Sequence, residues 1–173
     1  HSKHIYFNSI SQLMQFAPLV HQAGAKVGLR VNPNLSLVTN NALYDPSTKD
    51  SRFGVQPAEL TEEVMELVDV LHVHNLCENM ADDSVRLIEH VSQLLATSLT
   101  QVEAVNMGGG HYITHPDYDV DALIQAIRAF KAQHDVQLIL EPRGALVYDA
   151  GYLVGQVMDV FENTQKHAIL NIS

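Results

Sequence analysis

"QVEAVNMGGG", residues 101–110, is an apolar, strand-like run that leads directly into three glycines. Other runs rich in Val, Ile and Leu are similar: each is short, and most end in polar residues. These runs cover residues 4–8, 26–32, 68–75 and 136–142. Strands as apolar as these are buried on both faces, which is typical of parallel sheets that are covered by helices.

Segments with the apolar period of a helix lie between these runs. We predict helices over residues 9–24, 57–68, 81–99 and 120–134. Strands that alternate with helices indicate a parallel α/β fold. The ends of several strands carry polar residues or glycine, namely Asn32, His74, Gly108 and Glu141. This pattern favours a β/α barrel, whose functional groups gather at the carboxyl ends of its strands, over a doubly wound sheet with a single switch point.

The five strands are too few for a complete barrel, which needs eight units and about 250 residues. We therefore expect part of a (β/α)8 TIM-like barrel over residues 1–145. The tail "GYLVGQVMDVFENTQKHAILNIS" (151–173) has no helical stripe and is typical of two strands joined by a turn near "ENTQK". We predict that residues 146–173 begin a β-rich domain.

The composition narrows the classes of partner. The 173 residues include 20 Asp and Glu against 10 Lys and Arg, which argues against nucleic acid or an anionic membrane surface as the main partner. A small substrate that carries amines suits this charge, although solubility alone also explains it. Cys77 is the single cysteine, so we expect no internal disulfide, a buried thiol and a cytoplasmic setting. We expect no membrane span, because no apolar run approaches about 18 residues, and we see no signal peptide.

The strand ends carry candidate chemistry. Gly108, Gly109 and Gly110 leave backbone N–H groups open to an anion such as a phosphate, although a tight turn also explains them. Glu141 ends a strand before a proline, where a protonated ring nitrogen or Arg143 would be a suitable partner for its carboxylate.

The histidines allow three interpretations. His72 and His74 stand two apart on a strand, so both point to the same side. They could hold a metal together with His111 and His115, as in a metal-dependent hydrolase. Alternatively, one ring packs on a planar cofactor, or both are ordinary half-buried histidines. We assign no metal-binding residue from the sequence.

The motifs resemble those of the fold-type III pyridoxal-phosphate decarboxylases, the alanine-racemase-like barrels. Within that family they are most similar to the branch that decarboxylates carboxynorspermidine or carboxyspermidine in polyamine biosynthesis. The resemblance rests on "GLRVNP" (28–33), "YDPSTKDSRFGV" (44–55), "LHVHNLCEN" (71–79), "NMGGGHYITHPDYDVDALI" (106–124) and "LEPRGA" (140–145). A diaminopimelate-type amino-acid decarboxylase is the enzyme alternative, and a non-catalytic fragment or pseudoenzyme is another.

The resemblance implies roles for individual residues. Gly108, Gly109 and Gly110 would receive the phosphate of pyridoxal phosphate, His74 would stack on its pyridine ring, and Glu141 would pair with the pyridine nitrogen. His111, Thr114 and Asp117 would line the mouth near a polyamine-like substrate. The remaining expected site residues are Arg143 at the cofactor, and Arg30 and Arg52 at the substrate or its loop.

Several departures from the family pattern accompany these roles, among them Asn171 where an aspartate is usual. The sequence reads "EPRG" where the family has Glu-Pro-Gly, so Arg143 stands in the place of a glycine. The Schiff-base lysine of the family has no counterpart among the five lysines. The resemblance implies barrel strands four to eight and the start of the β domain. We therefore expect a chain that is inactive alone, and a homo-oligomer such as a dimer, or a complementing chain that supplies the missing strands.

Overall fold

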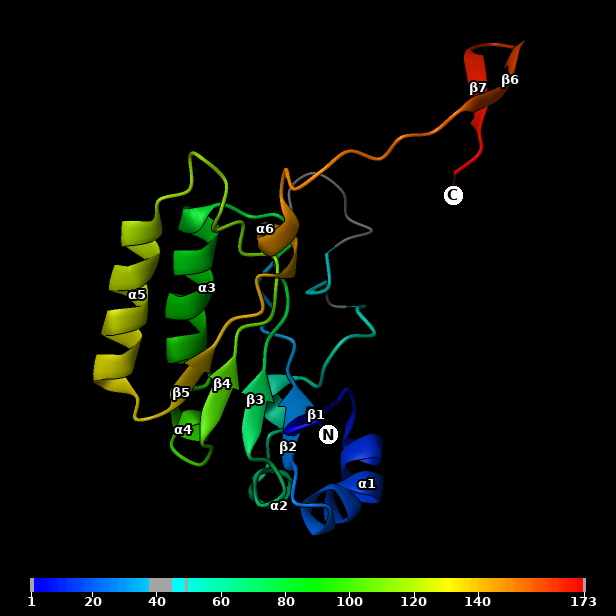
Figure 1. Ribbon diagram of the computed structural model, residues 1–173. Coiled ribbons are helices and arrows are strands. Elements are labelled where there is room, and N and C mark those ends of the chain that lie inside the picture. Colours follow the sequence, from blue (N-terminus) through cyan, green and yellow to red (C-terminus); the bar gives the residue numbers. More distant parts are fainter. Residues whose placement is uncertain (1, 38–44, 49, 173) are drawn as a thin grey trace.

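The centre of the molecule is one parallel sheet of five strands in the order β1-β2-β3-β4-β5 (Figure 1). The computed structural model describes residues 2–37, 45–48 and 50–172. The strands are β1 (His4–Phe7), β2 (Lys26–Arg30), β3 (Val70–His72), β4 (Ala104–Asn106) and β5 (Gln137–Ile139). Each strand pairs in parallel with the next one along the chain. This order has no reversal, so the doubly wound alternative is wrong and the arrangement is that of a barrel segment.

The strands are shorter than the apolar runs that predict them. The run over 68–75, for example, supplies only three paired residues, Val70–His72. Beyond His72 the chain leaves the sheet ladder, so His74 follows the strand and lies in the connecting loop. Burial of both faces explains the apolar composition, since Val70 and Leu71, which point to opposite faces of the sheet, are at most 1% exposed.

Three of the predicted helices are confirmed as long elements: α1 (Ile10–Gln22), α3 (Ala81–Leu94) and α5 (Val120–Gln133). Helix α1 begins after Ser9, whose side chain accepts a hydrogen bond from the Gln12 N–H, and it continues through Pro18. Helices α3 and α5 lie side by side on one face of the sheet (Figure 1). Their inward faces contain Ile88 and Phe130, both almost completely buried.

The prediction of a single helix over 57–68 is wrong. The structure has a short 3-10 helix, η2 (Pro57–Glu59), and a separate helix α2 (Glu62–Met65). Leu60 between them has a ψ of 63°, which no helix accommodates. The Thr61 hydroxyl then accepts a hydrogen bond from the Val64 N–H, so the chain starts a new helix at this point.

The predicted helix over 81–99 is also divided. Leu95, with φ −106° and ψ 15°, separates α3 from the short helix α4 (Ala96–Leu99). Leu95 stays buried, so its apolar side chain still belongs to the helical stripe that the sequence displays. The periodic pattern thus reports the buried face correctly and does not reveal the break in the backbone.

The tail forms the predicted pair of strands. An unanticipated helix α6 (Arg143–Val147) follows β5, and an extended segment leads from it to β6 (Val157–Glu162) and β7 (Lys166–Leu170). These two strands pair antiparallel, with the turn at residues 163–165. The hairpin stands apart from the sheet (Figure 1). The proposed domain boundary after residue 145 falls inside α6 and stays a prediction.

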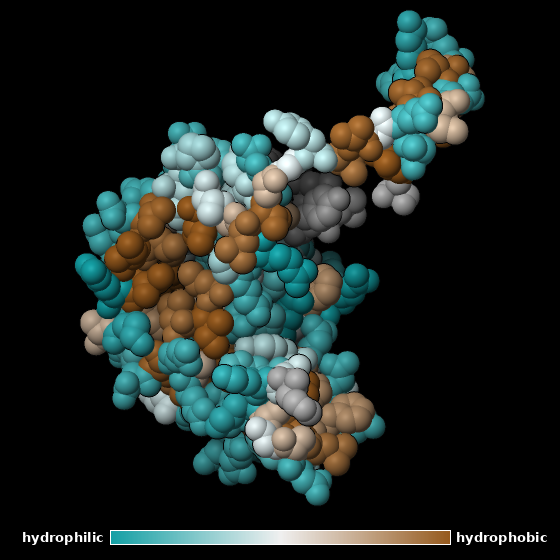
Figure 2. All heavy atoms as spheres, viewed as in Figure 1, coloured by the Kyte–Doolittle hydropathy of each residue, from teal (hydrophilic) through white to brown (hydrophobic). Residues whose placement is uncertain are grey.

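Apolar side chains remain on the surface of the barrel segment. Figure 2 shows a broad hydrophobic area over α3 and α5. Exposed apolar residues of these helices include Leu94, Val120 and Ile124. Strands β1 and β5 are the two edges of the sheet. No helix of the described ranges is long and apolar enough to cross a membrane.

Candidate active site at the carboxyl edge of the sheet

A cleft of about 570 Å³ opens where β4 and β5 end, beside the loop that follows β3. It is lined by His74, Gly109, Gly110, Leu140, Glu141, Pro142, Arg143 and Leu146. Parallel pairing places the carboxyl ends of these strands at one edge, so residues about 30 positions apart meet there. The structure therefore brings together the glycines, His74, Glu141 and Arg143, as the sequence predicts.

The glycine tract needs bare backbone for steric reasons. Gly108 and Gly110 have φ angles of 67° and 89°, which L-residues rarely adopt. A Cβ on Gly109 would lie 2.9 Å from the Glu141 carbonyl oxygen and 3.4 Å from His74 Nε2. A Cβ on Gly110 would lie 2.2 Å from the carbonyl group of Leu76. The turn interpretation is thus correct for the backbone, and the same turn presents Gly109 and Gly110 to the cleft.

Asn106, at the end of β4, organises the polar groups below the cleft. Its amide nitrogen donates to Glu141 Oε1 at 3.1 Å and to the Tyr6 hydroxyl at 3.0 Å. Its amide oxygen accepts from the Gly108 N–H at 2.8 Å. Asn106 thereby links β1, the glycine tract and the carboxylate. Our sequence analysis did not select Asn106 or Tyr6, although Asn106 immediately precedes the segment "MGGG" and ends its strand in the same way as the selected residues.

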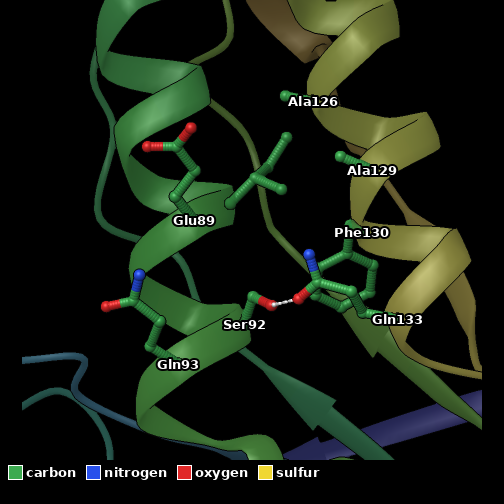
Figure 3. A pocket seen from close by; sticks show the side chains of 8 residues that line it. Glu89, Ser92, Gln93, Ala126, Ala129, Phe130 and Gln133 are labelled. Atoms are coloured by element: carbon green, nitrogen blue, oxygen red, sulfur yellow. Dashed lines mark hydrogen bonds between the residues drawn. The ribbon is translucent and has the colours of Figure 1, made fainter.

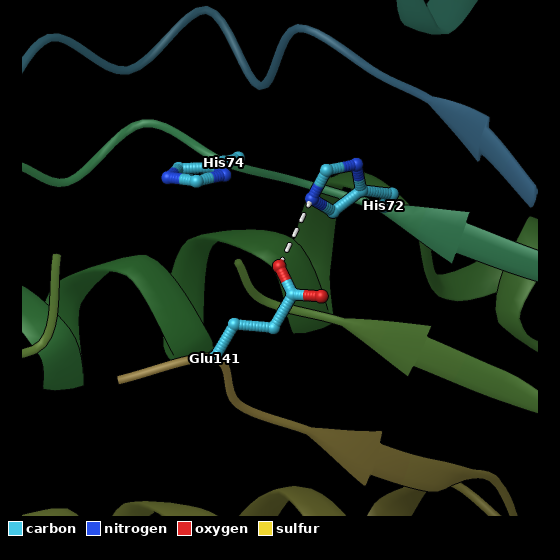
Figure 4. A group of neighbouring side chains, drawn as sticks. All are labelled: His72, His74 and Glu141. Carbon is cyan, nitrogen blue, oxygen red and sulfur yellow. Dashed lines mark ion pairs between the residues drawn. The ribbon is translucent and has the colours of Figure 1, made fainter. Parts of the chain in front are cut away.

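His72, His74 and Glu141 form a compact group of side chains (Figure 4). The second carboxylate oxygen of Glu141 lies 4.0 Å from His72 Nε2. Burial, together with the neighbouring charges of His74 and Arg30, lowers the pKa of His72 to about 4. Burial also lowers the pKa of His74, with Arg30 adding to the effect. Both rings are therefore neutral near pH 7.

Arg30 lies beneath this group and supports it. Its guanidinium donates to the His74 carbonyl oxygen at 2.8 Å and lies 4.5 Å from the centre of the Phe53 ring. Arg52 lies over the same ring at 5.0 Å. Burial lowers the pKa of Arg30. Arg30 thus holds the backbone at His74, and a substrate contact of Arg30 or Arg52 stays a prediction.

His111 does not line the mouth of the cleft, so that expectation is wrong. Its side chain is 1% exposed and its Nδ1 lies 2.9 Å from the Ser84 hydroxyl, which also accepts from the Tyr118 hydroxyl at 2.7 Å. The φ angle of Gly110 turns the chain inward at this point, and His111 continues into the interface with α3. Burial lowers the pKa of His111 to about 4.

The remaining predicted residues have individual positions. The Thr114 hydroxyl donates to the Ala145 carbonyl oxygen at 2.6 Å, which ties its loop to α6. Asp117 is exposed, with its carboxylate 3.9 Å from His115 Nδ1. Arg143 lines the cleft and makes no ion pair with Glu141. Cys77 is exposed, which corrects the expectation of a buried thiol.

The four-histidine metal site is not assembled. His111 contacts Ser84 and His115 lies beside Asp117, away from the group of His72 and His74. Residues 38–44 and 49, which include part of the motif "YDPSTKDSRFGV" (44–55), lie outside the described residues. A second cavity, about 360 Å³ between α3 and α5, contains the hydrogen bond from Ser92 to Gln133 (Figure 3). It belongs to the helical layer and does not reach the strand ends.

Known proteins with sequences similar to this chain are decarboxylases. The chain is 35% identical over 172 residues, 99% of its length, to a carboxynorspermidine/carboxyspermidine decarboxylase of Campylobacter jejuni. The chain is similar to carboxynorspermidine/carboxyspermidine decarboxylases. It is also 34% identical over 99% of its length to the carboxyaminopropylagmatine decarboxylase of Synechocystis. A diaminopimelate decarboxylase of Methanocaldococcus jannaschii is 29% identical over 90% of the chain.

Solved structures confirm the fold as part of a barrel. The crystal structure of carboxynorspermidine decarboxylase from Campylobacter jejuni, complexed with norspermidine, matches 98% of the chain with a TM-score of 0.77 and 32% identity. A viral arginine decarboxylase bound to agmatine matches 98% with a TM-score of 0.67 and 18% identity, which shows the fold alone. The chain spans 42% and 47% of these structures, and 44%, 45% and 41% of the three curated relatives. No family model matches the chain.

Proposed function

We propose that this chain is part of a pyridoxal-phosphate-dependent decarboxylase that acts on carboxynorspermidine or carboxyspermidine in polyamine biosynthesis. One observation carries the proposal: the glycine tract, His74 and Glu141 meet in one cleft of a chain that is 35% identical to such a decarboxylase over 99% of its length. The relative indicates the reaction, and the cleft supplies groups that would hold the cofactor.

The residues of the cleft fit the cofactor. The positions of Gly109 and Gly110 exclude a Cβ, so their backbone can approach a phosphate closely. Arg143, which replaces the glycine of Glu-Pro-Gly, adds a cation at the same cleft, and a cation suits a phosphate. The Glu141 side chain is 48% exposed and has one oxygen that Asn106 does not engage, which suits a protonated ring nitrogen.

Each residue has a distinct part in the proposed reaction. Bound pyridoxal phosphate supplies an electron sink for the electron pair that remains when the carboxylate leaves as CO2. Glu141, oriented by Asn106, would keep a proton on the ring nitrogen of the bound cofactor. His74 offers a neutral ring, held by the Arg30 contact to its backbone, on which a planar cofactor can pack. Arg30, Arg52, Thr114 and Asp117 remain the proposed substrate contacts. His111 is better assigned to positioning the glycine tract.

The nature of the substrate is the finer part of the proposal. Carboxynorspermidine and carboxyspermidine carry amines, and the formal net charge of −10 favours binding of such cations. Carboxyaminopropylagmatine is a specific alternative, because the Synechocystis relative is 34% identical to the chain. These substrates share a carboxylated polyamine chain and differ at the far end, where an amine replaces a guanidinium group. Diaminopimelate is the second alternative, on the basis of the weaker 29% identity.

The test uses the longer protein that contains this chain, loaded with pyridoxal phosphate. Its rate of CO2 release should be highest with carboxynorspermidine or carboxyspermidine. Faster turnover of carboxyaminopropylagmatine would move the substrate assignment to the alternative, and faster turnover of diaminopimelate would overturn the proposal. Glu141→Gln should lower kcat about 100-fold or more, in line with the loss of a group that acts on a proton at the reacting centre. Homo-oligomeric assembly and a cytoplasmic setting stay predictions.

A further inference from the structure

We propose that His72, His74 and Glu141 bind one divalent transition-metal ion when the cofactor is absent, and that metal and cofactor exclude each other. The metal site rests on geometry alone. Only the exclusion rests on the proposed function, because it requires His74 and Glu141 to contact pyridoxal phosphate.

The three side chains are close enough to share an ion. One ring nitrogen from each histidine and one carboxylate oxygen all lie within 4.8 Å of one another. Ligands that bind one tetrahedral zinc ion at 2.0–2.2 Å lie about 3.3–3.6 Å apart. The pair His72 Nε2 and Glu141 Oε2, at 4.0 Å, is slightly wider than this. Shifts of about 1–1.5 Å, shared between the half-exposed Glu141 side chain and the histidine rings, would bring the three ligands to this spacing.

His72 has binding capacity that its surroundings do not use. Both of its ring nitrogens are buried, and neither has a hydrogen-bond partner within the described part of the chain. Buried polar atoms are rarely left without a partner, and a bound ion is one of the ordinary explanations. Glu141 Oε2 lies 4.0 Å from His72 Nε2, so an ion between them would engage both.

The ligand set selects the type of ion. Two imidazoles with one carboxylate suit Zn²⁺ and its neighbours in the first transition row, whereas Mg²⁺ and Ca²⁺ prefer oxygen ligands throughout. Three protein ligands leave a fourth position open, and the cleft beside His74 and Glu141 gives water access to it. The site should consequently bind Zn²⁺ and Co²⁺ and should not bind Mg²⁺.

The experiment measures metal binding by the tag-free chain at pH 7.5, without pyridoxal phosphate. Equilibrium dialysis against zinc chloride should give one bound ion per chain, and Co²⁺ should give a visible spectrum of a four-coordinate ion. His72→Gln and Glu141→Gln should each weaken the affinity about tenfold or more. His115→Gln and His4→Gln are matched controls, because they remove imidazoles outside the group, and they should change the affinity less than twofold.

The outcomes separate the two proposals. Failure to bind one Zn²⁺ per chain overturns the site, as does binding that is lost with His4 or His115 and unaffected by His72→Gln. Glu141→Gln tests the site without disturbing the core, because this side chain is half-exposed. A loss of affinity in this variant is therefore not explained by misfolding. In a competition with the longer protein, pyridoxal phosphate should displace Zn²⁺. Simultaneous binding of both overturns the exclusion, whereas loss of pyridoxal phosphate binding alone would count against the proposed function and leave the metal site intact.

Discussion

Ser84, His111 and Tyr118 form a buried polar group behind the glycine tract. All three are at least 94% buried, and the Ser84 hydroxyl interacts with both of the other side chains. Since His111 directly follows Gly110, this group fixes the end of the tract against α3. A buried donor or acceptor that loses its partner costs about 1–3 kcal/mol, so each member depends on the others.

We expect Ser84→Ala to lower the free energy of unfolding by about 1–3 kcal/mol, because His111 and Tyr118 both lose their partner. Ser92→Ala is the matched control: it removes the same atom from the same helix, but its partners His134 and Gln133 are half-buried and exposed, respectively. The control should cost less than about 1 kcal/mol. Urea denaturation followed by circular dichroism measures both, and equal losses would contradict the importance of the buried group.

The neutral state of His111 predicts a dependence of stability on pH. Its pKa is about 4 in the folded chain, against an ordinary value of 6.5. The unfolded chain therefore takes up a proton first, so stability is lost as the pH falls from about 6.5 towards 4. The histidine should account for roughly 3 kcal/mol of this loss.

His111→Gln isolates this contribution, because glutamine can still bond to Ser84 and does not titrate. We expect the difference in unfolding free energy between the original chain and this variant to shrink as the pH falls from 7 to 4.5. Denaturation curves at four pH values provide the measurement. A constant difference would show that His111 is not buried in its neutral form.

At the scale of elements, the cleft depends on one loop that joins β4 to the segment before α5. Gly108 and Gly110 reverse the direction of this loop with positive φ angles. The Asn79 N–H donates to the Gly110 carbonyl oxygen at 2.8 Å, so the loop is also bonded to the chain that follows β3. The position of the cleft residues is thus decided by backbone contacts between two loops.

Gly110→Ala should destabilise the chain by more than about 3 kcal/mol, since its Cβ would lie 2.2 Å from Leu76 and its φ is 89°. Gly24→Ala provides a matched control. Gly24 also has a positive φ, 72°, but a Cβ there meets nothing within 4 Å. This control should cost about 1–2 kcal/mol, the price of the left-handed conformation alone. Thermal melting compares the two, and similar shifts would show that the loop can relax around the methyl group.

At the scale of the whole molecule, the chain presents a five-stranded barrel segment with an edge at β1 and another at β5. An apolar groove lined by Ile5, Phe7, Phe16, Leu19, Val20 and Ala23 lies beside β1. Open edges and apolar grooves favour association with further strands, which agrees with the expected oligomer or complementing chain. The chain spans less than half of the length of its curated relatives.

We expect the chain alone to be inactive, because no lysine of the described ranges lies at the cleft. Lys3 precedes β1 and Lys26 begins β2, so both lie at the amino ends of the strands, opposite the cleft. There the Lys26 N–H donates to the Lys3 carbonyl oxygen. Lys131 belongs to α5 and Lys166 begins β7, while Lys49 is outside the described residues. Treatment with pyridoxal phosphate and borohydride, followed by peptide mapping, should mark no single lysine stoichiometrically. One fully marked lysine would overturn this expectation.

The sequence by itself determined the parallel α/β architecture, the order of its elements and the residues that meet at the carboxyl edge. These features follow from hydrophobic period and strand direction, which are local properties of the chain. For this reason the sequence alone could predict that glycines 108–110, His74 and Glu141 lie at one site. Only the tertiary structure decided that His111 turns inward, that Arg30 supports the backbone at His74, and that Asn106 orients Glu141. Those outcomes depend on backbone angles and on contacts between residues 27 to 44 positions apart, which no local pattern records.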